Sequence, residues 1–325
     1  MKAILYRPPG GSENLYLDDV DAPVPKSGEV LVRNFAAGVN RADLLQTRGL
    51  YPPPPGASEI LGLEFAGEVL TCAPDVEGFS TGDRVFGIVA GGSYAEQLCV
   101  DHAMALRIPD NFSYETAAAV PEVFITAAEA LFTHGGLRSG ERVLLHAGAS
   151  GVGTAAIQLA KRVGAEVIVT AGTSEKVAAC LELGAHHGIV YREQDFGDGV
   201  AEITNREGVD LVVDFIGADY WKRNIASLRV GGRLVLLGLL GGAKTSLDLA
   251  PILRKRLRVC GHTLRGRPLA EKIAIAGRFV TESLPGLADG SLKPVIDHVF
   301  VFDEVARAHE RMEKNQNLGK IVLRF

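Results

Sequence analysis

The stretch LLHAGASGVG, residues Leu144–Gly153, decides the fold of this chain, because an apolar strand runs directly into a turn of small residues. A helical run over Thr154–Val163 follows the turn. Glycine serves where backbone approaches a ligand closely or adopts a positive φ. A helix N-terminus adds unpaired N–H groups and the positive end of the helix dipole. The pattern therefore predicts a pyrophosphate site.

The glycine spacing is G-x-x-G-x-G, with a serine where the usual G-x-G-x-x-G fingerprint has its second glycine. A second apolar run, Glu166–Thr170, begins thirteen residues after Gly153, which is the length of a crossover helix and its turn. This setting favours a dinucleotide site over an ordinary tight turn. The residues of the turn expected to contact the cofactor are Gly148, Ser150, Gly151, Val152 and Gly153.

Length and composition indicate a globular protein of two domains. The chain has 325 residues, of which 47% are hydrophobic and 22% charged. Its net charge is −5, and it has no basic block or basic stripe, so we expect no nucleic-acid partner. The 38 glycines suit a fold with many tight connections between strands and helices.

The cysteines form no disulfide or metal pattern. All four are far apart, without a C-x-x-C pair, and are expected to be small buried residues: Cys72, Cys99, Cys180 and Cys260. The chain opens on a strand rather than a signal-peptide pattern. Its apolar runs look too short and too interrupted for a membrane span. We therefore expect a cytoplasmic protein with no membrane contact.

The rhythm of the sequence changes twice. Residues 1–120 read as short strands between glycine turns, typical of a partly open barrel. Residues 121–264 alternate six strands with helices, which predicts a doubly wound parallel sheet, and residues 265–325 are expected to complete the first domain. The expected fold is therefore α/β, with a Rossmann domain inserted into a β-rich domain.

Two features bear on the cofactor. An NAD enzyme places an acid about 20 residues after the glycine turn, but this chain has Ala171 there, followed by Gly172, Thr173, Ser174 and Lys176. Hydroxyls and an ammonium suit a 2′-phosphate, so the sequence favours NADPH over NADH. Glu175 fits an ordinary acid in the first turn of a helix. Gly217 and Gly238 end later strands, where a crossing cofactor requires small residues.

The whole chain resembles the zinc-independent, zeta-crystallin-like quinone oxidoreductases of the medium-chain dehydrogenase/reductase superfamily. The resemblance rests on Gly38–Asp43, Tyr51–Gly67 (YPPPPGASEILGLEFAG), Gly82–Val85, His146–Lys161 (HAGASGVGTAAIQLAK), Thr170–Lys176 and Asn317–Leu323. It implies a GroES-like catalytic domain, reduction of quinones by NADPH, and a homodimer or a dimer of dimers.

Departures from the zinc-dependent relatives imply a site without metal. Asn40 replaces a cysteine ligand, and Leu63-Glu64 replaces a histidine and glutamate pair. No cysteine occurs around Glu122. Because catalytic zinc needs three protein ligands, we expect none. Without a metal, acceptors that are electrophilic unaided, such as quinones or activated enones, are favoured over simple aldehydes.

The resemblance also assigns individual roles. Tyr51 is expected to contact the acceptor, either as its proton donor or only as a positioning group, and YPPPPG is equally a rigid connector. The Asn40 amide either reaches the nicotinamide or substrate or stabilises a turn, and Asp43 is expected to cap a helix. The remaining cofactor contacts that the resemblance implies are Thr126 at the nicotinamide ribose, Tyr191 at the adenine, Gly241 and Asn317.

Two other functions stay open from the sequence. An NADPH-dependent reductase of enones or 2-enoyl thioesters would share the fold and the cofactor. A non-catalytic, crystallin-like NADPH-binding protein would bind the cofactor without turnover.

Overall fold

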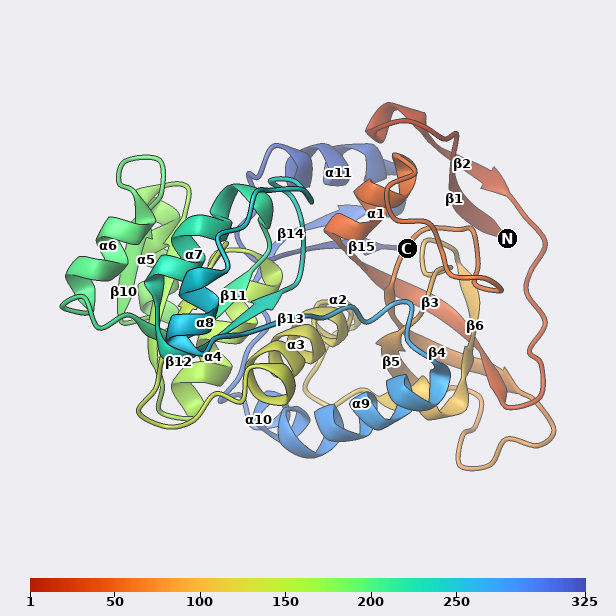
Figure 1. Ribbon diagram of the computed structural model, residues 1–325. Helices are drawn as coiled ribbons and strands as arrows, with labels where there is room; N and C mark the ends of the chain where they lie inside the picture. Colours follow the sequence, from red (N-terminus) through yellow and green to blue (C-terminus); the bar gives the residue numbers. More distant parts are fainter. The chain divides into compact units, whose positions relative to one another are not determined.

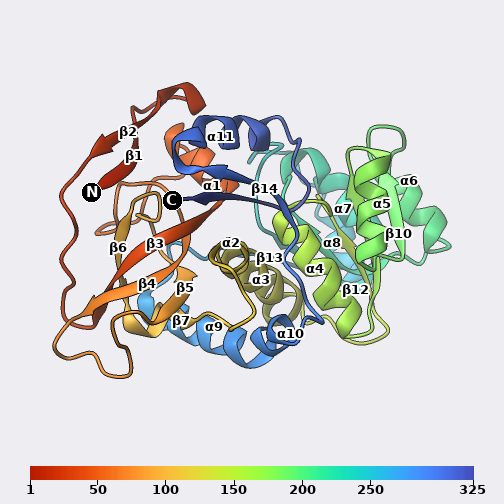
Figure 2. The same ribbon diagram turned by 180° about the vertical axis from the view of Figure 1, so that it is seen from behind.

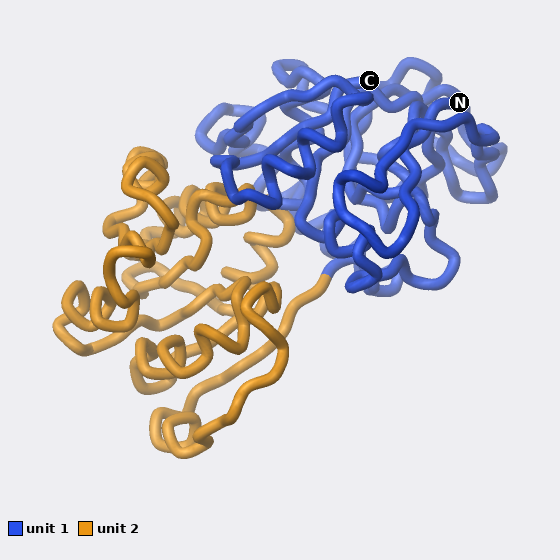
Figure 3. Tube along the Cα trace, turned by 90° about the horizontal axis from the view of Figure 1, so that it is seen from above, with its two compact units in different colours: residues 1–123, 264–325 blue, residues 124–263 orange.

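The computed structural model describes all 325 residues. The chain forms two compact units (Figure 3): Met1–Val123 with Leu264–Phe325, and Phe124–Thr263. They are called unit 1 and unit 2 below. The second is inserted into the first, since the chain enters it after Val123 and leaves it at Thr263.

Unit 2 is built on a six-stranded parallel sheet with the order β10-β9-β8-β11-β12-β13 (Figure 1). Its strands are β8 (Arg142–Leu145), β9 (Glu166–Ala171), β10 (His187–Val190), β11 (Val209–Asp214), β12 (Leu228–Leu236) and β13 (Arg258–Gly261). Numbered from β8, this order is 3-2-1-4-5-6, the order of a dinucleotide-binding sheet. The predicted fold class is confirmed.

The helices of unit 2 follow the strands. They are α4 (Gly151–Arg162), α5 (Ser174–Leu183), α6 (Phe196–Ile203), α7 (Trp221–Ser227) and α8 (Ala250–Lys255). Strand order reverses at β8, so right-handed crossovers put α4 and α5 on one face of the sheet and α7 and α8 on the other. The core between sheet and helices includes Leu144, Ile168, Phe196 and Leu234, all buried.

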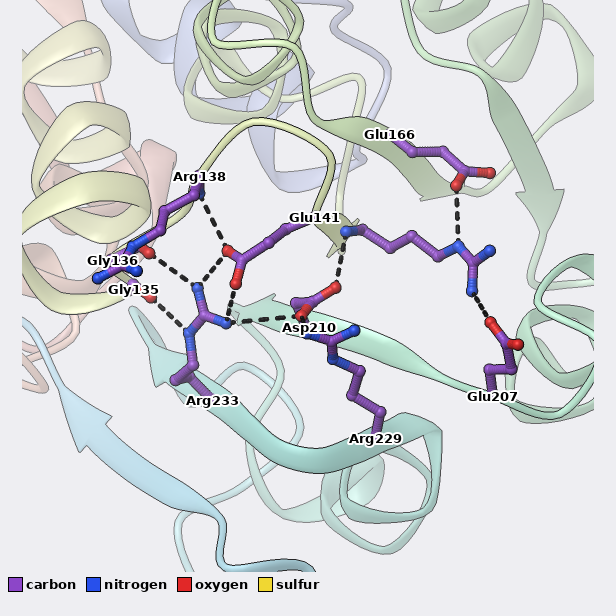
Figure 4. A network of polar contacts seen from close by, with 10 residues as sticks. Gly135, Gly136, Arg138, Glu141, Glu166, Glu207, Asp210, Arg229 and Arg233 are labelled. Carbon is purple, nitrogen blue, oxygen red and sulfur yellow. Dashed lines mark hydrogen bonds and ion pairs between the residues drawn. The ribbon is translucent and has the colours of Figure 1, made fainter.

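Ion pairs close the amino ends of these strands (Figure 4). The Arg233 guanidinium donates to the carbonyl of Gly135 at 2.6 Å and to both carboxylate oxygens of Glu141 at 2.9 and 2.6 Å. Arg142 donates to Glu166 at 2.8 Å and to Glu207 at 2.7 Å. These contacts tie β8, β9 and β12 together at one edge.

Unit 1 contains a largely antiparallel, seven-stranded sheet in the order β14-β15-β3-β4-β5-β7, with β6 paired to β3 (Figure 2). These strands are β3 (Glu29–Val39), β4 (Glu64–Cys72), β5 (Arg84–Ile88), β6 (Gln97–Asp101), β7 (Leu106–Arg107), β14 (Ile296–Val301) and β15 (Lys320–Arg324). A hairpin of β1 (Lys2–Tyr6) and β2 (Leu15–Asp19) stands beside them as a separate sheet. Because β15 pairs with β3, the C-terminal segment completes the sheet that the N-terminal segment begins.

The α-helices of unit 1 have five to fourteen residues each. They are α1 (Arg41–Thr47), α2 (Tyr114–Ala118), α9 (Leu269–Glu282), α10 (Leu284–Ala288) and α11 (Val305–Glu313), while α3 (Pro121–Ala128) crosses into unit 2. The short 3-10 turns are η1 (Ser12–Asn14), η2 (His102–Met104) and η5 (Phe302–Glu304), with η4 (Ala218–Tyr220) in unit 2. A π-helical turn, η3 (Glu129–His134), extends α3.

Of three local expectations, two are wrong. The helical stretch Tyr114–His134 has 21 residues and is long and apolar enough to cross a membrane, although 67% of its most apolar window is buried. Helix α1 begins at Arg41 with Asn40 as its N-cap, and the Asp43 carboxylate accepts the Asn40 backbone N–H at 2.8 Å to complete a capping box, so the expected capping role of Asp43 is confirmed. Helix α4 begins at Gly151, three residues before the expected start, because the glycines of the turn already adopt helical backbone.

Candidate active site and cofactor-binding residues

The turn after β8 has the geometry of an anion site. Ala147 adopts a left-handed φ of 49°, which carries the chain from the strand into the turn. Ser150 is the N-cap of α4, and its Oγ accepts the Gly153 N–H at 3.1 Å. Ser150, Gly151 and Val152 are partly exposed at the helix N-terminus. A phosphate placed there would meet N–H groups and the positive end of the helix dipole.

Gly148 and Gly153 serve the same turn by close packing. Both are buried. A Cβ on Gly148 would lie 2.8 Å from Val169 Cβ, and one on Gly153 would lie 2.4 Å from the Ala147 carbonyl oxygen. These two glycines therefore let α4 and β9 approach the turn.

A second turn follows β9. Thr173 caps α5 and its Oγ1 accepts the backbone N–H of Lys176 at 3.3 Å. The Glu175 carboxylate, which is fully exposed, bonds its own backbone N–H and the Thr173 hydroxyl, and these bonds lower its pKa. Glu175 thus behaves as a first-turn acid. Gly172, Thr173, Ser174 and Lys176 stand on this partly exposed turn.

The residues after β10 approach the same turn. A Cβ on Gly172 would lie 3.0 Å from the Tyr191 hydroxyl and 3.6 Å from Arg192 Nε. Tyr191 is 39% exposed. Sequence reasoning included Tyr191 but missed Arg192, because a single arginine after a strand carries no pattern.

Glycines shape the ends of β11 and β12 as well. Gly217 has a φ of 82°, and its N–H donates to the buried Asp214 carboxylate at 2.9 Å. Gly241 N–H donates to the Ile216 carbonyl at 2.7 Å, and a Cβ on Gly238 would lie 2.9 Å from the Phe215 carbonyl. Backbone hydrogen bonds therefore join the turn after β11 to the turn after β12 at the carboxyl edge of the sheet.

Below this edge lies a buried, neutral polar group. His146 is fully buried, with Nδ1 2.9 Å from Thr170 Oγ1 and Nε2 2.7 Å from Asn224 Oδ1. Burial lowers the pKa of His146 to about 4. The imidazole therefore stays uncharged and joins β8, β9 and α7 without placing a charge near the turn after β8.

Unit 1 contains a buried ion pair built from β4 and β15. Lys320 Nζ lies 2.5 Å from Glu64 Oε1, and the two side chains are 3% and 0% exposed. The ammonium also donates to the Val39 carbonyl at 2.9 Å and to Asn40 Oδ1 at 2.8 Å. Three oxygen acceptors thus hold one cation in the interior.

The Asn40 amide is part of this cluster. Its Nδ2 donates to Glu64 Oε1 at 2.8 Å, while its Oδ1 accepts from Lys320. Glu64 Oε2 accepts the Glu122 backbone N–H at 2.9 Å. Sequence reasoning quoted Lys320 within a matching motif but assigned it no role, because a lysine near the C-terminus gives no sign of burial.

Two acids, the buried Asp43 and the partly exposed Glu122, lie near the cluster. Burial, reinforced by the neighbouring charge of Glu64, raises the pKa of Glu122 to about 8. Burial also raises the pKa of Asp43 to about 6, although Asp43 accepts the backbone N–H groups of Asn40 and Gly62. Asp43 therefore holds α1 and the segment before β4 in place.

Tyr51 precedes the proline run and contacts Arg265, another residue that the sequence did not single out. The guanidinium lies 5.5 Å from the centre of the Tyr51 ring, and its Nη1 donates to the Tyr51 carbonyl at 3.1 Å. Burial, followed by the charge of Glu122, raises the pKa of Tyr51. Its hydroxyl therefore keeps its proton and is a weaker acid than a free phenol.

Thr126 and Asn317 are the last two residues predicted to contact the cofactor. Thr126 is partly exposed on α3. Asn317 Nδ2 donates to the Gly319 carbonyl at 2.9 Å, so this side chain shapes the turn that leads into β15.

A zinc ion does not fit the residues around Glu64. Zinc takes thiolate, imidazole or carboxylate ligands, three of them in a catalytic site. Here Asn40 replaces a thiolate, Leu63 supplies no donor, and Glu64 is neutralised by an ammonium at 2.5 Å.

Comparisons with known proteins identify the family. Residues 26–110 match the family described as alcohol dehydrogenase GroES-like domain, and residues 151–280 match zinc-binding dehydrogenase. Human quinone oxidoreductase is 30% identical over 329 residues, covering 99% of this chain and 97% of that protein. The chain belongs to the medium-chain dehydrogenase/reductase superfamily.

Two further proteins are similar to this superfamily member over most of its length. The rat synaptic vesicle membrane protein VAT-1 homolog is 32% identical over 97% of this chain and 81% of its own length. The structure of Escherichia coli quinone oxidoreductase complexed with NADPH is similar over 100% of both chains, with a TM-score of 0.91 and 32% identity. The predicted resemblance is confirmed, and with it the class of oxidoreductase.

Proposed function

We propose that this superfamily member reduces quinones with NADPH and uses no metal ion in the reduction. The observation that carries the proposal is the buried Lys320–Glu64 pair, in which an ammonium neutralises the one carboxylate left from the zinc ligand positions. Without a Lewis acid, the acceptor must already be electrophilic, and quinones meet this condition.

The preference for NADPH rests on the turn after β9. No acid ends this strand, and the one nearby carboxylate, Glu175, is engaged by Thr173. Lys176 and Arg192 flank the turn with positive charge. A 2′-phosphate would gain charge-assisted hydrogen bonds there, whereas a ribose hydroxyl would find no carboxylate.

Bound NADPH supplies the hydride that reduces the acceptor. Its pyrophosphate binds at the turn formed by Ser150, Gly151 and Val152. The cofactor can lie close to the protein backbone at Gly217, Gly238 and Gly241, because glycine has no side chain. Tyr51 orients the quinone by a hydrogen bond from its hydroxyl. The raised pKa of Tyr51 favours this positioning role, with water protonating the reduced product.

Steady-state rates with chelator-treated enzyme test the proposal. We expect turnover of 1,2- and 1,4-quinones with NADPH, and a kcat/KM for NADH lower by about tenfold or more, since charge-assisted bonds contribute about 1.5–3 kcal/mol. Faster turnover of crotonyl thioesters than of any quinone would establish the enoyl reductase instead. Tight NADPH binding with no turnover of either class would establish a non-catalytic binding protein.

Tyr51→Phe separates positioning from proton donation. As a positioning group, Tyr51 contributes a hydrogen bond of about 0.5–1.5 kcal/mol, so the KM for the quinone rises about 2- to 12-fold while kcat changes little. Tyr16→Phe, on the hairpin strand β2, is the matched control. A large fall in kcat with a changed solvent isotope effect would make Tyr51 the proton donor.

We also propose that two copies pair through β13. This edge strand has a free ladder of backbone groups, and exposed apolar residues cluster in and before it, including Leu249, Leu253 and Val259. A continuous sheet with a second copy would satisfy the edge. Light scattering should show a dimer that Val259→Lys dissociates, and a wild-type monomer at micromolar concentration would contradict the pairing.

A further inference from the structure

Unit 2 contains a cluster of three metal-binding side chains that the proposed function does not use. They are Glu129 and His134, the first and last residues of η3, and His262, directly after β13. One ligand atom from each side chain lies within 4.8 Å of the other two. His134 Nε2 and His262 Nδ1 are 3.1 Å apart.

The π-helical turn is what brings Glu129 and His134 together. The two residues are five positions apart, and an α-helix of 3.6 residues per turn would separate their side chains by about 140° around its axis. A π-helix closes its hydrogen bonds between residues five apart, so the two side chains share one face. Such turns occur frequently at functional sites.

The donors form a set that zinc accepts. Two imidazoles and one carboxylate, with a fourth position for water, are a known zinc arrangement. Zinc–ligand bonds of about 2.0–2.2 Å put neighbouring ligand atoms about 3.3 Å apart in a tetrahedron. The pair of nitrogens is already near this separation, and the carboxylate oxygen has to approach by up to about 1.5 Å.

The surroundings support the same use. Glu129 and His262 are 3% and 4% exposed, and the Thr133 hydroxyl donates to Glu129 Oε1 at 2.9 Å. A hydrogen bond of this kind orients a carboxylate ligand. One carboxylate and two neutral imidazoles would leave a divalent ion with a single net positive charge.

We propose that Glu129, His134 and His262 bind a divalent transition metal ion, with zinc as the best fit. The ion would link the helix near the point where the chain enters unit 2, at Phe124, to the strand end just before it leaves, at Thr263. Its role would be to stabilise unit 2, independently of hydride transfer.

Zinc titration of untagged, chelator-stripped protein tests the site. We expect one zinc ion per chain by equilibrium dialysis, and a Tm that rises with the logarithm of zinc concentration. Cobalt substitution should give the visible absorption of a tetrahedral ion. His134→Gln and His262→Gln should each abolish stoichiometric binding, and Glu129→Gln should weaken it at least tenfold. His298→Gln, an exposed histidine of unit 1, is the control.

Two results would overturn the proposal. One is the absence of stoichiometric zinc binding at micromolar zinc by folded wild-type protein, which would make the cluster a purely hydrogen-bonded group. The other is zinc binding that persists in both histidine variants. Circular dichroism of each stripped variant shows whether it is folded, and Glu129→Gln, the nearly isosteric change, carries the test if a histidine variant unfolds. Neither readout depends on NADPH or on quinone turnover.

Discussion

The two edges of the parallel sheet in unit 2 are built from opposite kinds of residue. The amino edge is closed by charges, with Arg233 buried between Glu141 and two backbone carbonyls (Figure 4). The carboxyl edge has partly exposed turns of glycine, serine and threonine, above the neutral His146. At the amino edge the polar groups pair with one another. At the carboxyl edge the N-terminus of α4 has backbone N–H groups that a ligand could accept.

If NADPH binds at the carboxyl edge as proposed, this one sheet separates the residues that stabilise unit 2 from those that bind the cofactor. A buried guanidinium is tolerated only where carboxylates and carbonyls satisfy it. A fixed charge of that kind below the turn after β8 would change the electrostatic potential at the proposed cofactor site. His146, which burial keeps neutral, adds no such charge. Substitutions of the buried groups should therefore affect stability, and substitutions of the exposed turn residues should affect cofactor binding.

The largest effect is expected at the amino edge. Arg233→Met removes the partner of Glu141 and leaves two carbonyls unsatisfied, which should lower the free energy of unfolding by about 3–5 kcal/mol. The affinity for NADPH should stay within about twofold of wild type. Urea unfolding and cofactor titration measure the two quantities.

Arg162→Met, at the exposed end of α4, is the control for Arg233→Met and should change stability by less than about 0.5 kcal/mol. A weaker NADPH affinity in Arg233→Met without loss of stability would show that the two edges are not separate in function.

A smaller change in the free energy of unfolding is expected at the carboxyl edge when the pH is lowered. The pKa of His146 is about 4 in the fold, below about 6.5 in the unfolded chain, so its contribution is present above pH 6.5 and is lost as the pH falls to about 4. The full contribution is about 3 kcal/mol. In His146→Gln this part of the pH dependence should disappear.

The test is the difference in unfolding free energy between wild type and His146→Gln at pH 7 and pH 4.5. Other shifted groups are common to both proteins: His309, with a pKa lowered to about 3 by burial, loses stability in acid too, whereas Asp43 and Glu122 act in the opposite direction. Parallel pH profiles for the two proteins would refute the assignment to His146.

The smallest effect is expected on cofactor choice. Lys176→Met should weaken NADPH binding by about 1.5–3 kcal/mol, or about 10- to 150-fold, and leave NADH binding and stability nearly unchanged. Arg192→Met should act in the same direction. Lys222→Met, on an exposed face of α7, is the control, and equal losses for both cofactors would show that Lys176 does not recognise the 2′-phosphate.

Much of the fold was predictable because its determinants are local. The apolar strand before Gly148 and the alternation after it gave the order of elements in unit 2, which the strand order confirms. Helix α11 was missed because only three of its nine residues are buried and apolar, and strand β7 was missed because it has only two residues. The 21-residue stretch Tyr114–His134 was overlooked since polar residues interrupt it in the sequence.

The candidate site was less predictable, because its partners come from distant segments. Lys320 meets Glu64 across 256 positions, and Arg265 meets Tyr51 across 214. The Asn40 amide, expected either to reach the nicotinamide or substrate or to stabilise a turn, forms hydrogen bonds with Glu64 and Lys320 that the sequence did not indicate. Likewise, no spacing rule links His262 to His134.

Short runs of sequence were enough to predict the strand–turn–helix around Gly148, the lack of an acid after β9 and, taken together along the chain, the superfamily. The folded chain was needed to show which buried charges meet, such as Lys320 with Glu64, and which donors cluster, such as Glu129 with His262. The physical reason is that burial and pairing depend on contacts between segments that folding alone brings within a few ångströms.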